Sequence, residues 1–185
     1  EYALQNGCQA ARVSIITAKS NEFEYRDTQI DQLTQSTRNK IYIEIFVDNK
    51  YGSFSTNRIE KSELETFIKE GIASTKYLSE DKYRQLPDAK RYYKPNGGDL
   101  DLFDKSYDNV ATEKKIELAK QTVEEIYGSD DRIISVSSNY DDGIGAEYMV
   151  TSNGFEGEAT DSGYNLSVSV SLKTGGDARA ESYWY

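Results

Sequence analysis

The sequence predicts an α+β fold in which two main helices accompany an antiparallel sheet or sheets. Apolar and polar residues alternate with a period of two in several runs, most clearly over residues 41–47. Two other runs, 62–78 and 112–127, repeat apolar residues at helical spacing. Several strands follow one another directly in each half of the chain. This order favours α+β over a fold that alternates strands with helices.

The first half begins with residues 1–7, which are predicted to end a helix that Gly7 terminates. Along residues 41–47, an aliphatic face of Ile41, Ile43, Ile45 and Val47 alternates with Tyr42, Glu44 and Phe46, and residues 48–50 form the turn of a hairpin. Residues 22–26 and 28–35 are separate or continuous segments. The strands predicted in this half are 12–17, 22–26, 28–35, 41–47 and 51–55.

Two helices and a connector follow. Ser62 and Glu65 have the spacing of a capping box, which predicts a helix over residues 62–78 that packs on the aliphatic face of strand 41–47. Residues 79–108 contain the only two prolines and form a connector. A second helix is predicted over 112–127. Its buried stripe is formed by Ile116, Ala119, Val123 and Ile126.

The second half repeats the order of the first. Its predicted strands are 132–138, 146–152, 155–159 with its continuation, 164–173 and 177–185. We therefore interpret residues 1–185 as a single domain with a possible internal repeat of 1–78 and 109–185, linked by 79–108. An internal duplication is the hypothesis that this pattern suggests.

Charge and composition narrow the class of protein. The net charge is −10, which disfavours direct nucleic-acid binding because an acidic surface repels phosphate. No run approaches the roughly 20 apolar residues that span a bilayer. The single cysteine, Cys8, cannot form an intrachain disulfide, which suits the cytoplasm, and its small-residue setting favours a buried side chain over a nucleophile.

Histidine is absent from all 185 residues. Serine and cysteine hydrolases usually need an imidazole base, and catalytic zinc usually needs imidazole ligands. We therefore predict no catalytic, cofactor-binding or metal-ligating residue in this chain. A hydrolase that uses only carboxylates stays open, although no carboxylate pair stands out.

Acidic clusters have structural explanations. The carboxylates of Asp99, Asp101 and Asp104 are of the kind that bind calcium. The residues between them, Leu100, Leu102 and Phe103, are apolar, and this favours a strand or turn instead. Residues 141–143 are typical of a turn. Residues 143–145 (Gly-Ile-Gly) open no helix and are therefore not a phosphate loop.

Aromatic residues at the end of the sequence suggest an interface. The chain has 15 tyrosines and one tryptophan, and tyrosine is enriched at protein interfaces. Tyr183, Trp184 and Tyr185 form our candidate interface, within a final strand that pairs with 164–173. The alternative is that Trp184 folds onto the core of this same domain.

Several short motifs resemble the TldD/PmbA family, in the same order and over nearly the whole chain. Residues 51–57 (YGSFSTN) resemble the family's "G-x-a-S-T" strand end, and residues 99–104 (DLDLFD) resemble its "DLDLF" segment. The remaining similar motifs are the helix containing 71–73 (GIA), the turn 86–88 (LPD), the helix 113–119 (EKKIELA), the strand entry 131–133 (DRI) and the turn 151–154 (TSNG). The DLDLF segment and the ending Asp177-x-x-x-Glu181-x-Tyr183 are more similar to the PmbA (TldE) branch.

The resemblance implies an N-terminal domain of a bacterial protein whose C-terminal domain is absent from this chain. It implies a non-catalytic PmbA/TldE-like component of a cytoplasmic TldD/TldE-type metalloprotease system that processes peptides. Zinc would bind only in the C-terminal domain of a TldD-type chain, through a His-Glu-x-x-x-His helix. The implied partners are a TldD-like subunit or further copies of this chain, and peptide substrates, without nucleic acid or membrane. Older naming links the family to DNA gyrase, so the alternative is an acidic binding module that modulates gyrase or another DNA enzyme.

Overall fold

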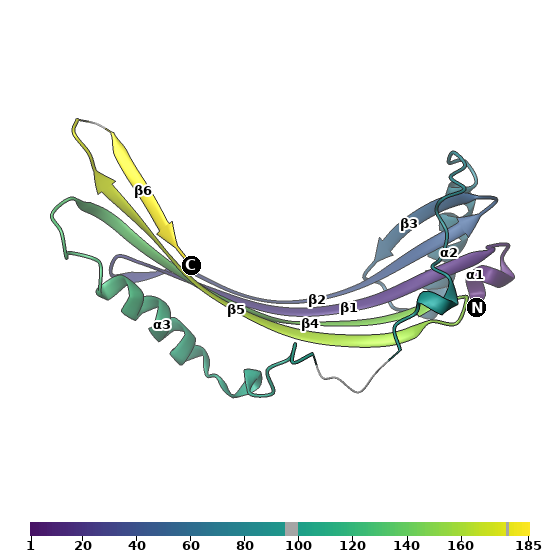
Figure 1. Ribbon diagram of the computed structural model, residues 1–185, viewed down its shortest axis with the longest axis horizontal. Helices are drawn as coiled ribbons and strands as arrows, with labels where there is room; N and C mark the ends of the chain where they lie inside the picture. Colours follow the sequence, from purple (N-terminus) through teal and green to yellow (C-terminus); the bar gives the residue numbers. More distant parts are fainter. Residues whose placement is uncertain (95–99, 177) are drawn as a thin grey trace. The chain divides into compact units, whose positions relative to one another are not determined.

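The computed structural model describes residues 1–94, 100–176 and 178–185. Its strands form one six-stranded antiparallel sheet in the order β3-β2-β1-β4-β5-β6. The strands are β1 (Ala10–Arg26), β2 (Gln29–Val47), β3 (Lys50–Thr56), β4 (Ile133–Thr151), β5 (Glu156–Lys173) and β6 (Arg179–Trp184). The helices are α1 (Tyr2–Gln5), α2 (Lys61–Thr75) and α3 (Thr112–Glu124), with the 3-10 turns η1 (Ala89–Arg91) and η2 (Tyr107–Asn109) (Figure 1). The predicted α+β class with two main helices is confirmed.

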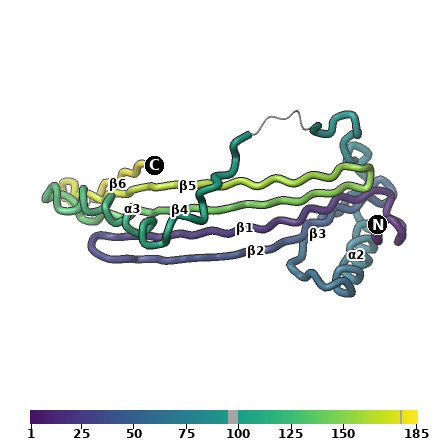
Figure 2. The backbone as a smooth tube through the Cα atoms, turned by 90° about the horizontal axis from the view of Figure 1, so that it is seen from below, coloured from purple at the N-terminus to yellow at the C-terminus, as the bar shows by residue number. Residues whose placement is uncertain are grey.

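Four of the strands are longer than the sequence predicts. Segments 12–17 and 22–26 join in β1, and 28–35 joins 41–47 in β2. The second half does the same, with 132–138 and 146–152 in β4, and 155–159 and 164–173 in β5. The prediction of separate strands was wrong because polar residues do not end a strand whose neighbours satisfy its backbone. Figure 2 shows these four strands side by side.

The predicted hairpin between β2 and β3 is confirmed. Asp48 and Asn49 have positive φ angles of 52° and 58°. A two-residue hairpin turn of type I′ needs this conformation at both positions, and Asp and Asn tolerate it better than most residues. The turn sets a register in which Ile43 lies opposite Phe54 and Val47 lies opposite Lys50.

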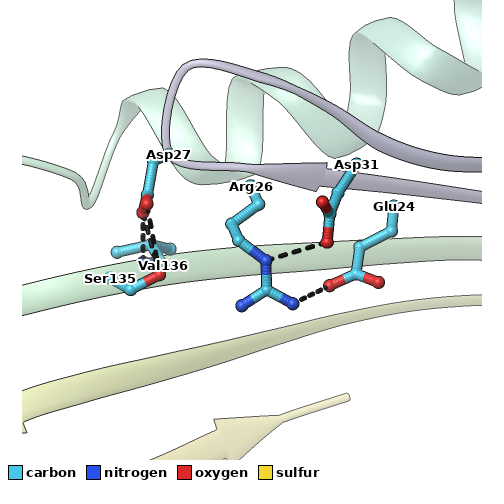
Figure 3. A network of polar contacts seen from close by, with 6 residues as sticks. All are labelled: Glu24, Arg26, Asp27, Asp31, Ser135 and Val136. Atoms are coloured by element: carbon cyan, nitrogen blue, oxygen red, sulfur yellow. Dashed lines mark hydrogen bonds and ion pairs between the residues drawn. The ribbon is translucent and has the colours of Figure 1, made fainter.

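A polar network closes the turn between β1 and β2 (Figure 3). Asp27 has a φ of 53°, and its carboxylate accepts hydrogen bonds from the Val136 amide at 2.8 Å and the Ser135 hydroxyl at 3.0 Å. Arg26 lies beside it and donates to Asp31 at 2.9 Å and to Glu24 at 2.6 Å. The end of the hairpin is therefore tied to β4 by side-chain bonds as well as by the ladder.

The chain divides into two compact units. Unit 1 comprises Glu1–Ala18, Arg38–Leu100 and Gly145–Thr160, and unit 2 comprises Lys19–Thr37, Asp101–Ile144 and Asp161–Tyr185. The units interleave along the sequence and do not coincide with residues 1–78 and 109–185, so the internal duplication stays a prediction. No helix in the described ranges is long and apolar enough to cross a membrane.

Unit 1 has its core between the sheet and α2. The aliphatic face of β2 is buried as predicted, with Ile43 3% and Ile45 0% exposed. Ile72 of α2 belongs to the same cluster, and Leu64 and Phe67 pack against it. Gly52 makes the close approach possible, because a Cβ there would lie 2.2 Å from the Thr75 hydroxyl oxygen.

The predicted capping box of α2 is wrong. The helix begins at Lys61 with Glu60 as N-cap, and no side chain caps it. Ser62 lies inside the helix, where its carbonyl accepts a bond from the Thr66 hydroxyl. The Ser-x-x-Glu spacing does not by itself distinguish a cap from the first turn, where Glu63 suits the positive end of the helix dipole. The helix also ends at Thr75 rather than at residue 78.

Unit 2 has its core between the sheet and α3. Phe23 of β1, Tyr140 of β4 and Ala119 of α3 form its centre, and the rings of Phe23 and Tyr140 lie 6.3 Å apart. Ala119 and Val123 are fully buried as the helical stripe predicts, and Ile116 packs against the cluster. Ile126 lies two residues past the end of α3, which stops at Glu124 instead of residue 127.

Candidate functional site

The aromatic residues at the end of β6 are exposed. Tyr183, Trp184 and Tyr185 are 75%, 78% and 81% exposed. The rings of Tyr183 and Tyr185 stack, with 6.3 Å between their centroids and an interplanar angle of 14°. β6 pairs with β5 as predicted, with Trp184 opposite Val168. Asp177, the predicted start of this strand, lies outside the described residues. Trp184 therefore does not fold onto the core of this domain, and its role in an interface stays a prediction.

Fluorescence of Trp184, the only tryptophan, tests this exposure. We expect the monomeric protein to emit at long wavelength and to be quenched readily by acrylamide, because the indole is largely in water. A blue-shifted emission protected from the quencher would contradict the described position. Loss of quenching in the presence of a partner would support an interface.

The most organised polar group in unit 2 surrounds the carboxylate of Asp142. The sequence suggested a turn at residues 141–143, but this was wrong because these residues lie within β4. Asp142 points toward α3, and its side chain is 0% exposed. It accepts four bonds from groups on β1, η2, α3 and β4: Asn21 Nδ2 at 2.7 Å, Tyr107 Oη at 2.5 Å, Lys115 Nζ at 2.5 Å and Tyr140 Oη at 3.1 Å. We call these five residues the Asp142 network.

The electrostatics of the network favour an ionised carboxylate. Burial by itself raises the pKa of Asp142, but the hydrogen bonds from Asn21, Lys115 and the two tyrosines together hold this pKa below its usual range. Burial and the neighbouring carboxylate raise the pKa of Tyr107 and of Tyr140. The Lys115 ammonium also lies 5.0 Å from the centroid of the Tyr107 ring, a cation–π distance.

Both oxygens of the Asp142 carboxylate are occupied by donors of this same chain, so we assign the network a structural role. Asp142 has a donor on each oxygen and no free lone pair directed at a substrate. It fixes the η2 connector and α3 onto the sheet. A polar cavity of about 400 Å³ lies beside it and is lined by Lys19, Ser20, Asn21, Gln35, Ser36, Thr37, Tyr107, Asp108, Val110, Thr112 and Lys115. Asp142 itself does not line this cavity.

Sequence reasoning missed this network. The helical spacing that identified Ala119 and Val123 also places Lys115 on the buried face, one turn earlier. A lysine in a buried stripe needs a buried anion, because an unpaired charge is too costly to bury. Lys115 was thus the available indication, although the sequence could not say which of 32 acidic residues it meets.

The acidic segment 99–104, for which the sequence favoured a strand or turn over a calcium site, is only partly within the described residues. Asp99 lies outside the described residues. Asp104 accepts bonds from the Ser106 amide at 2.8 Å and hydroxyl at 2.7 Å, and these bonds with that of Tyr164 lower its pKa. Within residues 1–94, 100–176 and 178–185, no three His, Cys, Asp or Glu side chains are grouped to hold a metal ion.

Cys8 is buried as predicted, and the glycines at residues 143 and 145 lie in a strand. Residues 143–145 lie within β4 and open no helix. Gly143 packs closely against β1, since a Cβ there would lie 3.0 Å from the Lys19 carbonyl oxygen. Cys8 is buried in the core of unit 1, where its thiol donates to the Ala10 carbonyl at 2.7 Å. Burial raises the pKa of this thiol, which disfavours the nucleophilic thiolate.

Two models of known protein domains match this chain. Residues 11–75 match the family model of the PmbA/TldA metallopeptidase domain 1, and residues 105–185 match that of the central domain. No curated protein gives a match.

Solved structures cover almost the whole chain. A Bacteroides thetaiotaomicron protein described as a "putative modulator of DNA gyrase" is 46% identical over 99% of this chain, with a TM-score of 0.94. A Thermotoga maritima protein of like description is 18% identical over 98% of the chain (TM-score 0.72), and TldE from Thermococcus kodakarensis is 13% identical over 98% (TM-score 0.71). The last two show the fold alone.

The chain spans about two fifths of the length of these relatives, 41%, 40% and 40% respectively. Two successive domain models and a close structural relative agree with the resemblance seen in the motifs. The chain belongs to the PmbA/TldD metallopeptidase family.

Proposed function

We propose that this chain is a non-catalytic part of a PmbA/TldE-like component in a cytoplasmic metalloprotease system that processes peptides. Family membership supports the link to peptidases. The observation that carries the proposal is the absence of histidine from a chain of a metallopeptidase family. Hydrolysis would then take place on residues outside this sequence, and this chain would position the substrate or a partner subunit.

The residues of this chain do not fit a catalytic zinc site. Such sites use imidazole, thiolate or carboxylate ligands, usually with at least one histidine. Here histidine is missing and the thiol of Cys8 is buried and hydrogen-bonded to backbone carbonyls. The Asp142 carboxylate is neutralised by Lys115. Zinc in our proposal is bound by a TldD-type subunit, and no step of its chemistry involves these residues.

A peptidase assay tests the proposal. The protein by itself should not hydrolyse casein or a peptide library, with or without added zinc. A TldD-type subunit with a His-Glu-x-x-x-His helix should hydrolyse peptides faster or more selectively when this protein is added. Activity of this protein alone that survives repurification would contradict the proposal, as would a lack of effect on the partner.

A second candidate function is modulation of DNA gyrase by an acidic binding module. It is favoured by the net charge of −10 and by the description of two structural relatives as "putative" gyrase modulators. An acidic surface suits a protein that occupies a DNA-binding enzyme rather than DNA. Binding to purified gyrase without proteolysis would support this function, and the absence of saturable binding would remove it.

A further inference from the structure

A groove of about 320 Å³ lies in unit 1 on the face of the sheet opposite α2. Its residues alternate along the strands with the buried aliphatic positions that face the helix, as Tyr42 and Glu44 alternate with Ile43. The groove crosses four neighbouring strands, β3, β2, β1 and β4. It is lined by Arg12, Ser14, Ile16, Tyr42, Glu44, Ser53, Glu147 and Met149.

Two of its charges neutralise each other. Arg12 forms an ion pair with Glu44, whose side chain is 14% exposed. Glu44 also accepts a hydrogen bond from the Tyr51 hydroxyl at 2.6 Å. The Tyr42 ring faces a cation of this same chain, because Lys40 Nζ lies 4.7 Å from its centroid. Arg12, Glu44 and Tyr42 already have partners within the chain, so we do not expect them to attract a charged ligand strongly.

Glu147 differs from them. It is half-buried in the groove, and within the described part of the chain it forms no hydrogen bond or ion pair. A partly desolvated carboxylate gains most from a cation that brings its own hydrogen-bond donors. Ile16 and Met149 line the same groove and provide apolar surface for methylene groups. The net charge of −10 also favours the approach of a basic partner.

We propose that this groove binds a lysine or arginine side chain of a peptide, with Glu147 as its counter-ion. The aliphatic part of the side chain lies along Ile16 and Met149, and its charged end meets the carboxylate. The inference rests on the proposed function only in treating such peptides as substrates of the protease system. It adds a preference for peptides with basic residues, which membership of the peptidase family does not by itself imply.

Binding is tested directly, by fluorescence anisotropy of labelled heptapeptides that are acetylated and amidated at their ends. The lysine peptide should bind, and the same peptide with norleucine should bind at least tenfold more weakly. Glu147→Gln should weaken lysine-peptide binding at least tenfold. Glu158→Gln is the matched control, because it removes one exposed charge from β5 of the same unit outside the groove, and it should change binding less than twofold.

Three results would overturn the inference. These are no binding at millimolar peptide, equal binding of the lysine and norleucine peptides, or equal weakening by the two glutamate variants, which would indicate non-specific attraction. The norleucine comparison uses the unaltered protein and so does not depend on the folding of a variant. Since no proteolysis is measured, failure here leaves the peptidase proposal intact, and failure of the peptidase assay leaves this binding result intact.

Discussion

Asp142→Asn is expected to lower the free energy of unfolding by about 3–5 kcal/mol, the usual cost of removing one partner from a buried ion pair. The reason is that Lys115, whose side chain is 6% exposed, would keep its charge without a counter-ion. Tyr107 donates to one carboxylate oxygen and Tyr140 to the other, and asparagine keeps a single acceptor oxygen, so one of the two hydroxyls would also lose its acceptor. Urea denaturation followed by circular dichroism gives the measurement.

Asp141→Asn is the matched control. Asp141 is the neighbouring residue of β4, and it accepts one exposed hydrogen bond from Asn165 at 2.8 Å. Surface substitutions of this kind usually change stability by about 0.5 kcal/mol or less. Equal costs for Asp141→Asn and Asp142→Asn would mean that the Asp142 network contributes little. Replacing both Asp142 and Lys115 by apolar residues should cost less than Asp142→Asn alone, because no unpaired charge is left.

The same variant should show a defined pH dependence. The pKa of Asp142 is lowered in the folded protein, so its ionised form stabilises the fold above the ordinary aspartate pKa of about 3.9. This contribution is lost as the pH falls from that value through the lower pKa of the folded state. The stability difference between the unaltered protein and Asp142→Asn should therefore be constant near neutrality and shrink below about pH 4.

Ile43→Ala is expected to lower the free energy of unfolding by about 2–5 kcal/mol, the usual range for truncating a buried large aliphatic residue. Ile43 is 3% exposed and belongs to the cluster that packs against α2. The truncation would leave a cavity between the sheet and the helix. Denaturant midpoints provide the measurement.

Glu44→Ala provides the comparison on the opposite face of the same strand. It removes the ion pair with Arg12 and the bond from Tyr51, both at a partly exposed site. Partly exposed ion pairs contribute on the order of 1 kcal/mol or less, so Glu44→Ala should cost less than Ile43→Ala. The reverse order would contradict the register of β2.

The sequence was informative where local chemistry and tertiary structure agree. The alternation over residues 41–47 and the Asp48-Asn49 turn are both local features, and both appear as predicted. The helical stripe of Ala119 and Val123 was equally clear. The pairing of the final strand with β5 also follows the prediction, whereas the interface role of Tyr183, Trp184 and Tyr185 stays a prediction.

The features that the sequence did not reveal depend on contacts between residues that are distant in sequence. Residues 141–145 contain two aspartates and two glycines, which taken alone favour a turn. They remain in β4 because Asp142 is neutralised by Lys115 and Asn21, which lie 27 and 121 residues away from it. In the same way, residues 36–40 are too polar to mark a strand, and β2 continues through them because the ladder to β1 satisfies the backbone.

The interleaving of the two compact units has a consequence for how this fold can change during evolution. The chain alternates between the units in six segments and so passes from one to the other five times. No single break in the gene could release either unit whole, so loss or exchange of one unit would require several breaks at once. The two runs that the family models match, residues 11–75 and 105–185, each contribute to both units. The two units are therefore expected to be inherited together as one piece.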